Sequence, residues 1–136
     1  MVIAVCVSND YGMMFNHRRQ SADRMVQKRL LEHTDHSILW MSHYSAGQFN
    51  TVQPNMRIDD NGLQLAGKND ICFLEEPVFP DGIPQCDQLI LYFWNRDYPA
   101  DTWFPREQLN RWKLKSTCEF KGTSHDVITE KIYEKK

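Results

Sequence analysis

The sequence has no long apolar run and no excess of charge of one sign, and each absence excludes a class of protein. The longest apolar stretch, residues 1–7, runs directly into Ser8-Asn9-Asp10. It is too short to cross a membrane, and no basic region precedes it as in a secretory signal. Sixteen Lys and Arg against eighteen Asp and Glu give a net charge of -2, so no overall field attracts nucleic acid or anionic lipid. We expect no membrane partner and no general affinity for nucleic acid.

Closely spaced cysteines are also lacking. The four that are present are Cys6, Cys72, Cys86 and Cys118, and no Cys-x-x-Cys pair or compact Cys/His group suggests a zinc site. We therefore predict no metal. The first three cysteines lie in or beside apolar segments, which predicts buried free thiols. Free thiols are typical of a reducing compartment, so we expect a cytoplasmic protein.

What is present is an ordinary globular composition. Apolar residues make up 41%, charged residues 25% and aromatic residues 12% of the 136 residues, which is enough to fold without disulfides or a structural metal. The sequence shows no internal repeat and no interdomain linker. It therefore predicts a single domain that spans residues 1–136.

Apolar runs of strand length alternate with helical patterns in the first half and dominate the last third. The predicted strands cover residues 2–7, 38–41, 55–58, 70–74, 89–94, 112–120 and 127–133. The predicted helices are one capped by Ser21 that ends near Thr34, a brief one capped by Ser45 that runs through Phe49, and one capped by Asp59 or Asp60 that ends at a left-handed Gly67. Prolines between residues 77 and 84 permit no more than a single helical turn there.

This order of elements predicts the α/β class, as a three-layer α/β/α sandwich. Its mixed sheet is expected to be mostly parallel, with helices on its faces, and to end in an antiparallel C-terminal hairpin. We expect the first and last strands to be neighbours in this common sheet.

Several stretches resemble dihydrofolate reductase in the order in which they occur, at the two ends of the chain. They are Gly12-Met13, Ser21-Ala22-Asp23, Leu39-Trp40-Met41, Ser42-His43-Tyr44-Ser45, Leu89-Ile90-Leu91-Tyr92, Asp101-Thr102-Trp103-Phe104-Pro105, Trp112, Phe120 and Ser124-His125. Asp-Thr-x-Phe-Pro is the most specific of these motifs. The resemblance implies a dihydrofolate-reductase-like fold that is shortened in its middle.

The chain is also similar to a group of short, uncharacterised proteins from Firmicutes, which implies a bacterial source. Some of these proteins carry the name ribonuclease Z. That activity is excluded here, because the His-x-His-x-Asp-His motif that would bind its catalytic metal is absent.

The sequence departs from the reductase family where that family binds its cofactor. The resemblance implies a glycine pair after the strand at residues 70–74, where a helix N-terminus approaches the cofactor pyrophosphate. Here that place is Leu74-Glu75-Glu76-Pro77, whose two carboxylates repel phosphate and whose backbone has no glycine. Ser42-His43 also replaces a glycine-arginine pair that holds the cofactor's phosphates. We therefore predict no cofactor, and NADPH binding in particular is not expected.

Candidate ligand-binding residues follow from the same resemblance. Asp23 falls on the catalytic carboxylate that pairs with a pterin. Spacing alone favours instead a carboxylate in the first turn of a helix that complements the helix dipole, and the resemblance brings the two interpretations level. Tyr92 stands where the family has a threonine that supports the pterin contact. The predicted site groups these two residues with Val5, Met25 and Ser45, and it would take a flat, pterin-like heterocycle or a nucleotide.

A run of basic residues offers a different interpretation. Arg18 and Arg19, together with Arg24, Lys28 and Arg29, form either a patch for phosphate or a nucleic-acid backbone, or a solvated loop and helix face. No aromatic platform for bases stands beside them in the sequence.

Two acidic or polar pairs also allow two interpretations each. Glu75 and Glu76, with Asp70 or Asp81, form either a Mg²⁺ site or a solvated loop. The adjacent Ser124-His125 would point to opposite faces of a strand, which favours a turn or hairpin role over a nucleophile and base that share a hydrogen bond.

Three functions remain open from the sequence. The first is a binding domain for a flat heterocycle that works without the usual nicotinamide cofactor. The second is an NADPH-dependent reductase, an enzyme of oxidoreductase type, with a rearranged cofactor site and Asp23 as its acid. The third is a regulatory or RNA-contacting protein that uses the basic residues.

Overall fold

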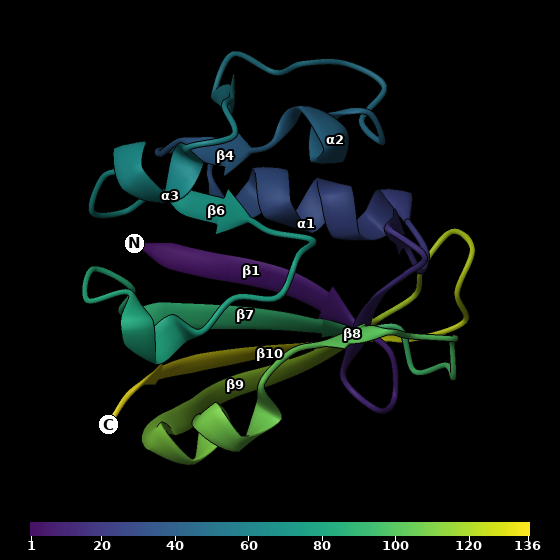
Figure 1. Cartoon of the computed structure of the whole chain (residues 1–136). Coiled ribbons are helices and arrows are strands. Elements are labelled where there is room, and N and C mark those ends of the chain that lie inside the picture. Colours follow the sequence, from purple (N-terminus) through teal and green to yellow (C-terminus); the bar gives the residue numbers. More distant parts are fainter.

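The computed structural model describes residues 1–136 and contains two β-sheets. Seven strands form the main sheet, in the order β5-β4-β6-β1-β7-β10-β9 (Figure 1). These strands are β1 (Val2–Val7), β4 (Leu39–Met41), β5 (Met56–Ile58), β6 (Ile71–Phe73), β7 (Gln88–Phe93), β9 (Trp112–Phe120) and β10 (Ile128–Lys135). The helices are α1 (Arg24–His33), α2 (His43–Ala46) and α3 (Gly62–Leu65), with 3₁₀ helices η1 (Pro80–Gly82) and η2 (Arg106–Arg111).

The main sheet is mostly parallel. β5, β4, β6, β1 and β7 run in one direction, and β10 lies antiparallel to both β7 and β9. The predicted mixed α/β sheet with an antiparallel C-terminal hairpin is therefore confirmed. The first and last strands share this sheet. The expectation that they are neighbours is wrong, because β7 lies between β1 and β10.

The structure also has a second, three-stranded sheet of order β3-β2-β8, which the sequence did not predict. It consists of β2 (Gly12–Phe15), β3 (Arg18–Arg19) and β8 (Thr102–Trp103). Asn16 and His17 join β2 to β3 with positive φ angles of 53° and 62°, the geometry of a two-residue type I′ hairpin turn. These strands are too short to show the alternation by which a strand is recognised in a sequence.

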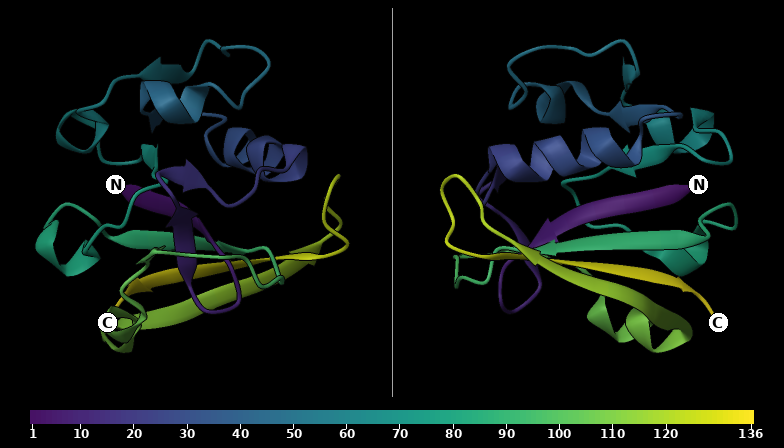
Figure 2. Two further views of the ribbon diagram at one scale, coloured as in Figure 1. Left: turned by 45° about the vertical axis from the view of Figure 1, so that its right-hand side comes forward. Right: turned by 180° about the vertical axis from the view of Figure 1, so that it is seen from behind.

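The side chains of the main sheet divide the core between its two faces. In β1, Val5 and Val7 pack on one face and Ala4 packs on the other. Helix α1 lies across the second face (Figure 2), where Val26 and Leu30 are buried. The first face is covered by α3, η2 and the three-stranded sheet, so this outer layer of the predicted sandwich consists mostly of turns and short strands.

Helix α1 begins at a different cap from the predicted one. Its N-cap is Asp23 and not Ser21: the Asp23 backbone is extended and its side chain accepts a hydrogen bond from the Met25 N–H at 2.9 Å. Aspartate caps a helix as well as serine does. Asp23 therefore precedes the first turn of the helix and does not lie inside it.

The two shorter helices also begin away from their predicted caps. Helix α2 follows Ser42, whose hydroxyl accepts from the Ser45 N–H at 3.1 Å, so Ser45 lies inside the helix that it was expected to cap. Helix α3 follows Asn61 and ends before Gly67, which is not left-handed because no glycine has a positive φ. None of the three helices has the length and apolar content that crossing a lipid bilayer requires.

All four cysteines are free. Cys72 and Cys86 are buried as predicted, and burial raises the pKa of their thiols to about 12 and about 11. Cys6 is only partly buried and Cys118 is exposed. The two buried thiols are protonated near neutral pH and do not serve as nucleophiles there.

Candidate functional site

A crevice opens at the carboxyl ends of the parallel strands β4 and β6. The chain leaves β4 toward β5 at the sheet edge and leaves β6 in the opposite direction, toward β7. Open α/β sheets bind their ligands at such switch points. The crevice has a volume of about 430 Å³ and is lined by residues 42–45, Asp60, Leu63 and residues 73–78.

The walls of the crevice combine apolar side chains with carboxylates. Phe73 and Val78 are buried beneath it, whereas Tyr44 is 46% exposed. Asp60 accepts a hydrogen bond from the His43 N–H at 3.0 Å. Glu76 is exposed and has no basic partner, so it is the carboxylate available to a ligand.

Glu75 is held more firmly than its neighbour. Arg19 Nε and Nη2 donate to its two oxygens at 2.8 and 3.1 Å, and Gln48 Nε2 donates at 3.1 Å. The Arg19 guanidinium also lies over the Tyr44 ring, with its Cζ 4.3 Å from the ring centroid. Arg19 and Arg18 are the two predicted phosphate-binding residues. Arg19 forms an ion pair with Glu75, whereas Arg18 is exposed.

These residues do not fit the pyrophosphate of a nicotinamide dinucleotide. Such a group needs N–H donors from a glycine-rich turn and the start of a long helix. After β6 the chain instead carries Glu75 and Glu76, and helix α2 is only four residues long. Each carboxylate that meets a phosphate at about 4 Å costs roughly 1 kcal/mol even in water.

Asp23 lies away from this crevice, where the β9–β10 loop (residues 121–127) covers the start of α1 (Figures 1 and 2). Its Oδ1 accepts from the N–H groups of Met25 and Thr123 and from the Thr123 hydroxyl, at 2.9, 3.0 and 3.1 Å. Its Oδ2 accepts from the N–H and hydroxyl of Ser124, at 2.9 and 3.2 Å, and lies 2.9 Å from Nδ1 of His125. The side chain has 0% exposed surface, so a ligand does not reach this carboxylate.

The same contacts determine the charge of Asp23. Burial alone would raise its pKa, but hydrogen bonds from the Thr123 N–H, the His125 ring and the Ser124 N–H outweigh burial and hold the pKa well below its ordinary value. Asp23 is therefore an anion near neutral pH. That state suits a hydrogen-bond acceptor and not a general acid.

The other residues of the predicted pocket are not brought together. Val5 packs in the core on one face of the sheet and Tyr92 in the core on the other, so the two do not line one cavity. The Tyr92 hydroxyl donates to Glu130 Oε2 at 2.9 Å. Met25 is partly buried at the start of α1, and Ser45 alone among these residues lines the crevice.

His125 makes contacts that the sequence did not indicate. It lies in the loop between two strands, as the predicted turn or hairpin role requires, and its ring stacks on Trp94 with centroids 4.5 Å apart. Its Nε2 lies 3.1 Å from Ser21 Oγ and 2.9 Å from the Tyr98 hydroxyl. Because Asp23 only accepts, the proton of the neutral ring resides on Nδ1, and Nε2 is the acceptor.

Gly122 is the point at which the loop comes closest to Asp23. A Cβ at this position would lie 2.5 Å from Asp23 Oδ2 and 2.8 Å from the His125 carbonyl oxygen. We expect Gly122→Ala to lower the free energy of unfolding by about 2 kcal/mol, as overpacked sites do. Gly82→Ala is the matched control, because nothing lies within 4 Å of its added Cβ. Urea unfolding followed by tryptophan fluorescence measures both, and equal midpoints would contradict the close approach.

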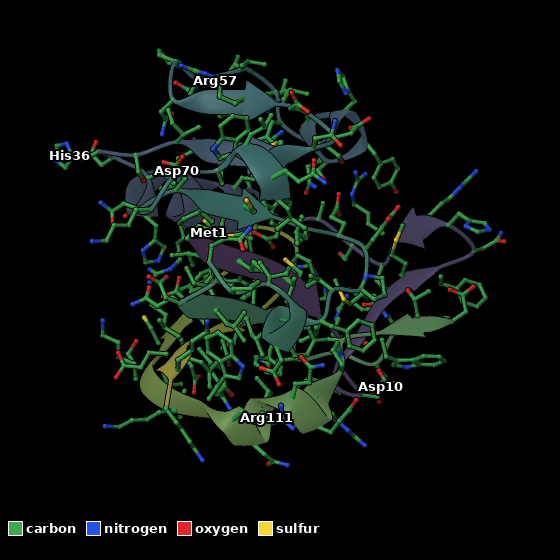
Figure 3. All side chains as sticks on the ribbon, turned by 60° about the vertical axis from the view of Figure 1, so that its left-hand side comes forward. Met1, Asp10, His36, Arg57, Asp70 and Arg111 are labelled. Atoms are coloured by element: carbon green, nitrogen blue, oxygen red, sulfur yellow. The ribbon has the colours of Figure 1, made fainter.

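No group of three or more His, Cys, Asp or Glu side chains is arranged to hold a metal ion. The carboxylates considered for Mg²⁺ are engaged separately. Asp70, labelled in Figure 3, accepts from Trp40 Nε1 at 3.0 Å and so joins β4 to β6. Asp81 accepts from Trp112 Nε1 at 3.2 Å and from Arg111 Nη1 at 3.3 Å. Neither joins the two glutamates after β6 in a cation site.

Comparison with known proteins places the fold. No protein-family model matches the sequence, and no curated protein matches it. The structure is similar to dihydrofolate reductase from Enterococcus faecalis in complex with NADP(H) and RAB-propyl, with a TM-score of 0.68. The match covers 99% of this chain and 96% of that chain, at 15% sequence identity. The domain thus has a dihydrofolate-reductase-like fold, as its motifs predicted, and at this identity the likeness extends to the fold alone.

Proposed function

We propose that this domain binds a flat heterocycle bearing amino groups in the crevice at the carboxyl ends of β4 and β6, without a phosphate-bearing nicotinamide cofactor. The observation that carries this proposal is the chemistry of the crevice walls. Tyr44 offers a half-exposed ring with the Arg19 guanidinium over one face, and Phe73 offers an apolar floor, whereas Glu76 offers a carboxylate without a partner. Aromatic faces stack on flat rings, and carboxylates accept charge-assisted hydrogen bonds from ring amino groups.

The acidic character of the crevice supports one ligand class over another. Asp60, Glu75 and Glu76 all line it, and only Glu75 is neutralised by an arginine. An uncharged or cationic pterin-like ring gains from this arrangement. A nucleotide phosphate in the same place meets like charge.

Less supports the two other functions. A reductase that uses Asp23 needs this carboxylate to contact substrate, and its oxygens are occupied by protein donors. A polyanion-binding surface needs several free basic residues. Arg19 and Arg29 are paired with Glu75 and Glu130, which leaves Arg18, Arg24 and Lys28 exposed.

Titration of the purified protein with folate and with NADPH tests this proposal. We expect folate to quench tryptophan fluorescence with saturation, and NADPH to show no saturable binding at millimolar concentration. Glu76→Gln is expected to weaken folate binding about tenfold, as the loss of one charge-assisted hydrogen bond would. Glu119→Gln, on the exposed strand β9 at the opposite edge of the sheet, is the control. Tight NADPH binding, or no folate binding at millimolar concentration, would count against the proposal.

A further inference from the structure

A second group of polar side chains lies at the start of α1, outside the crevice. We infer that Ser21, His125 and Asp23 form a nucleophile, a base and an orienting carboxylate that together hydrolyse esters bearing a negative charge. This inference is independent of the proposed ligand site, because none of the three residues lines the crevice.

The distances are those of an acyl-transfer triad. Ser21 Oγ lies 3.1 Å from His125 Nε2, and His125 Nδ1 lies 2.9 Å from Asp23 Oδ2. A base must be within hydrogen-bond reach of its nucleophile, and a carboxylate on the far nitrogen fixes the tautomer that leaves Nε2 free to take a proton. The same relations recur on unrelated folds and in any chain order, so the triad is recognised by geometry.

The carboxylate and the base of the triad are buried, and the nucleophile is partly exposed, as catalysis requires. The side chains of Asp23 and His125 are 0% and 2% exposed, whereas Ser21 is only partly buried. The carboxylate and base are therefore shielded from water, which strengthens their hydrogen bond. Ser21, at the end of the relay, is the member of the triad that lies nearest to solvent.

Ser21, and not the neighbouring Ser124, is in the position of a nucleophile. The Ser124 hydroxyl lies near Nδ1 of His125, the nitrogen that already faces Asp23, and its one proton is shared between the Ala22 carbonyl oxygen at 3.1 Å and Asp23 Oδ2 at 3.2 Å. Ser21 Oγ has His125 Nε2 as its single hydrogen-bond partner. Tyr98 shares that nitrogen at 2.9 Å, so one of the two hydroxyls donates to it at a time.

A cavity beside the triad indicates the class of substrate. It has a volume of about 260 Å³ and includes Tyr98, which contacts His125, and Gln20, which precedes Ser21. Phe15, 49% exposed, supplies an apolar surface, and the exposed Arg18 supplies a positive charge. A small ester that carries a carboxylate suits this lining, because arginine binds carboxylates in a forked geometry.

The hydrolysis balances with water as the only co-reactant. Ser21 Oγ bonds to the ester carbonyl carbon while its proton passes to His125 Nε2. The bond from that carbon to the alcohol oxygen then breaks, and the alcohol leaves with the proton from His125. Water attacks the acyl-serine, returns one proton through His125 to Ser21 Oγ, and releases the carboxylic acid. The backbone N–H groups of Ser21 and Ala22 have no protein acceptor and are the donors available to the oxyanion.

Covalent labelling with an aryl fluorophosphonate tests the triad on the intact protein. We expect a single adduct, located on Ser21 by tandem mass spectrometry. Ser21→Ala is expected to abolish it, and His125→Gln to slow it at least a hundredfold, in the range for loss of a general base. Ser116→Ala, at an exposed position of strand β9 away from the triad, is the matched control and is expected to keep the adduct.

The substrate class has its own measurement. We expect the protein to hydrolyse 4-nitrophenyl acetate more slowly than the same ester with a carboxylate on its ring, and Arg18→Ala to remove this preference. No adduct on Ser21 of the folded wild-type protein, or an adduct on Tyr98 or Ser124 instead, overturns the triad. Equal rates for the two esters overturn the role of Arg18 and the assigned substrate class.

Discussion

Asp23→Ala is expected to lower the free energy of unfolding by about 4 kcal/mol, because it removes the acceptor of a whole buried hydrogen-bond network. Removing one partner from a buried charged network costs about 3 to 5 kcal/mol, since the remaining groups lose their partner without regaining water. The N–H groups of Thr123 and Ser124 and Nδ1 of His125 all point at this carboxylate. The N-cap of α1 is lost in the same substitution.

Asp126→Ala is the control for Asp23→Ala, because Asp126 is an exposed carboxylate of the same loop. Its effect is expected to stay within about 0.5 kcal/mol, as for most surface substitutions. Urea unfolding gives both values, and hydrogen exchange of the Thr123 and Ser124 amides reports the loop directly. Similar stabilities for the two variants would show that the loop does not depend on the carboxylate.

Glu130→Gln is the second substitution with a large expected effect, of about 3 kcal/mol. Glu130 is 3% exposed. It accepts from Arg29 at 3.0 and 2.8 Å and from the Tyr92 hydroxyl at 2.9 Å, and it lies 2.9 Å from His33 Nε2. A neutral amide keeps the shape of the side chain but leaves the arginine uncompensated. Glu119→Gln, exposed on the neighbouring strand, is expected to change stability by less than about 0.5 kcal/mol.

The acid transition provides a second measurement on Glu130→Gln. Burial alone would raise the pKa of Glu130, but hydrogen bonds from His33, Arg29 and Tyr92 outweigh it and lower the pKa to about 2. A carboxyl group with a lower pKa in the folded state stabilises the fold above its unfolded pKa of about 4.3, and this contribution is lost as the pH falls. Between about pH 4.3 and pH 2, the stability of Glu130→Gln is therefore expected to fall less steeply than that of the wild type. Parallel slopes would contradict the lowered pKa.

The main sheet was predicted well because burial on both faces leaves a continuous apolar run in the sequence. Val2–Val7 is such a run and was predicted with the bounds that the structure has. Trp112–Phe120 is exposed along most of its length, and its bounds were predicted from strand composition instead. The helix starts were predicted less well. Ser21 and Asp23 are both capping residues, and the choice between them is made by Thr123 and Ser124 of a distant loop.

The contacts of Asp23 and the composition of the predicted pocket could not be predicted from the sequence. Asp23 and His125 are 102 positions apart, and no local spacing connects them. Val5 and Tyr92 were grouped by resemblance, but the register of β1 on β7 pairs Val5 with Leu91 and Cys6 with Tyr92. Successive residues of a strand point to opposite faces, so this register alone separates the two residues.

The β9–β10 loop and strand β10 also determine when the protein can complete its folding during translation. Asp23 and Arg29 leave the ribosome early, whereas their partners Ser124 and Glu130 follow about a hundred residues later. Until then β7 lacks its antiparallel neighbour, and the Asp23 cap of α1 lacks the loop that encloses it. The nascent chain therefore completes its fold only once its final hairpin has been made. Its unpaired strand edge is meanwhile a target for chaperones.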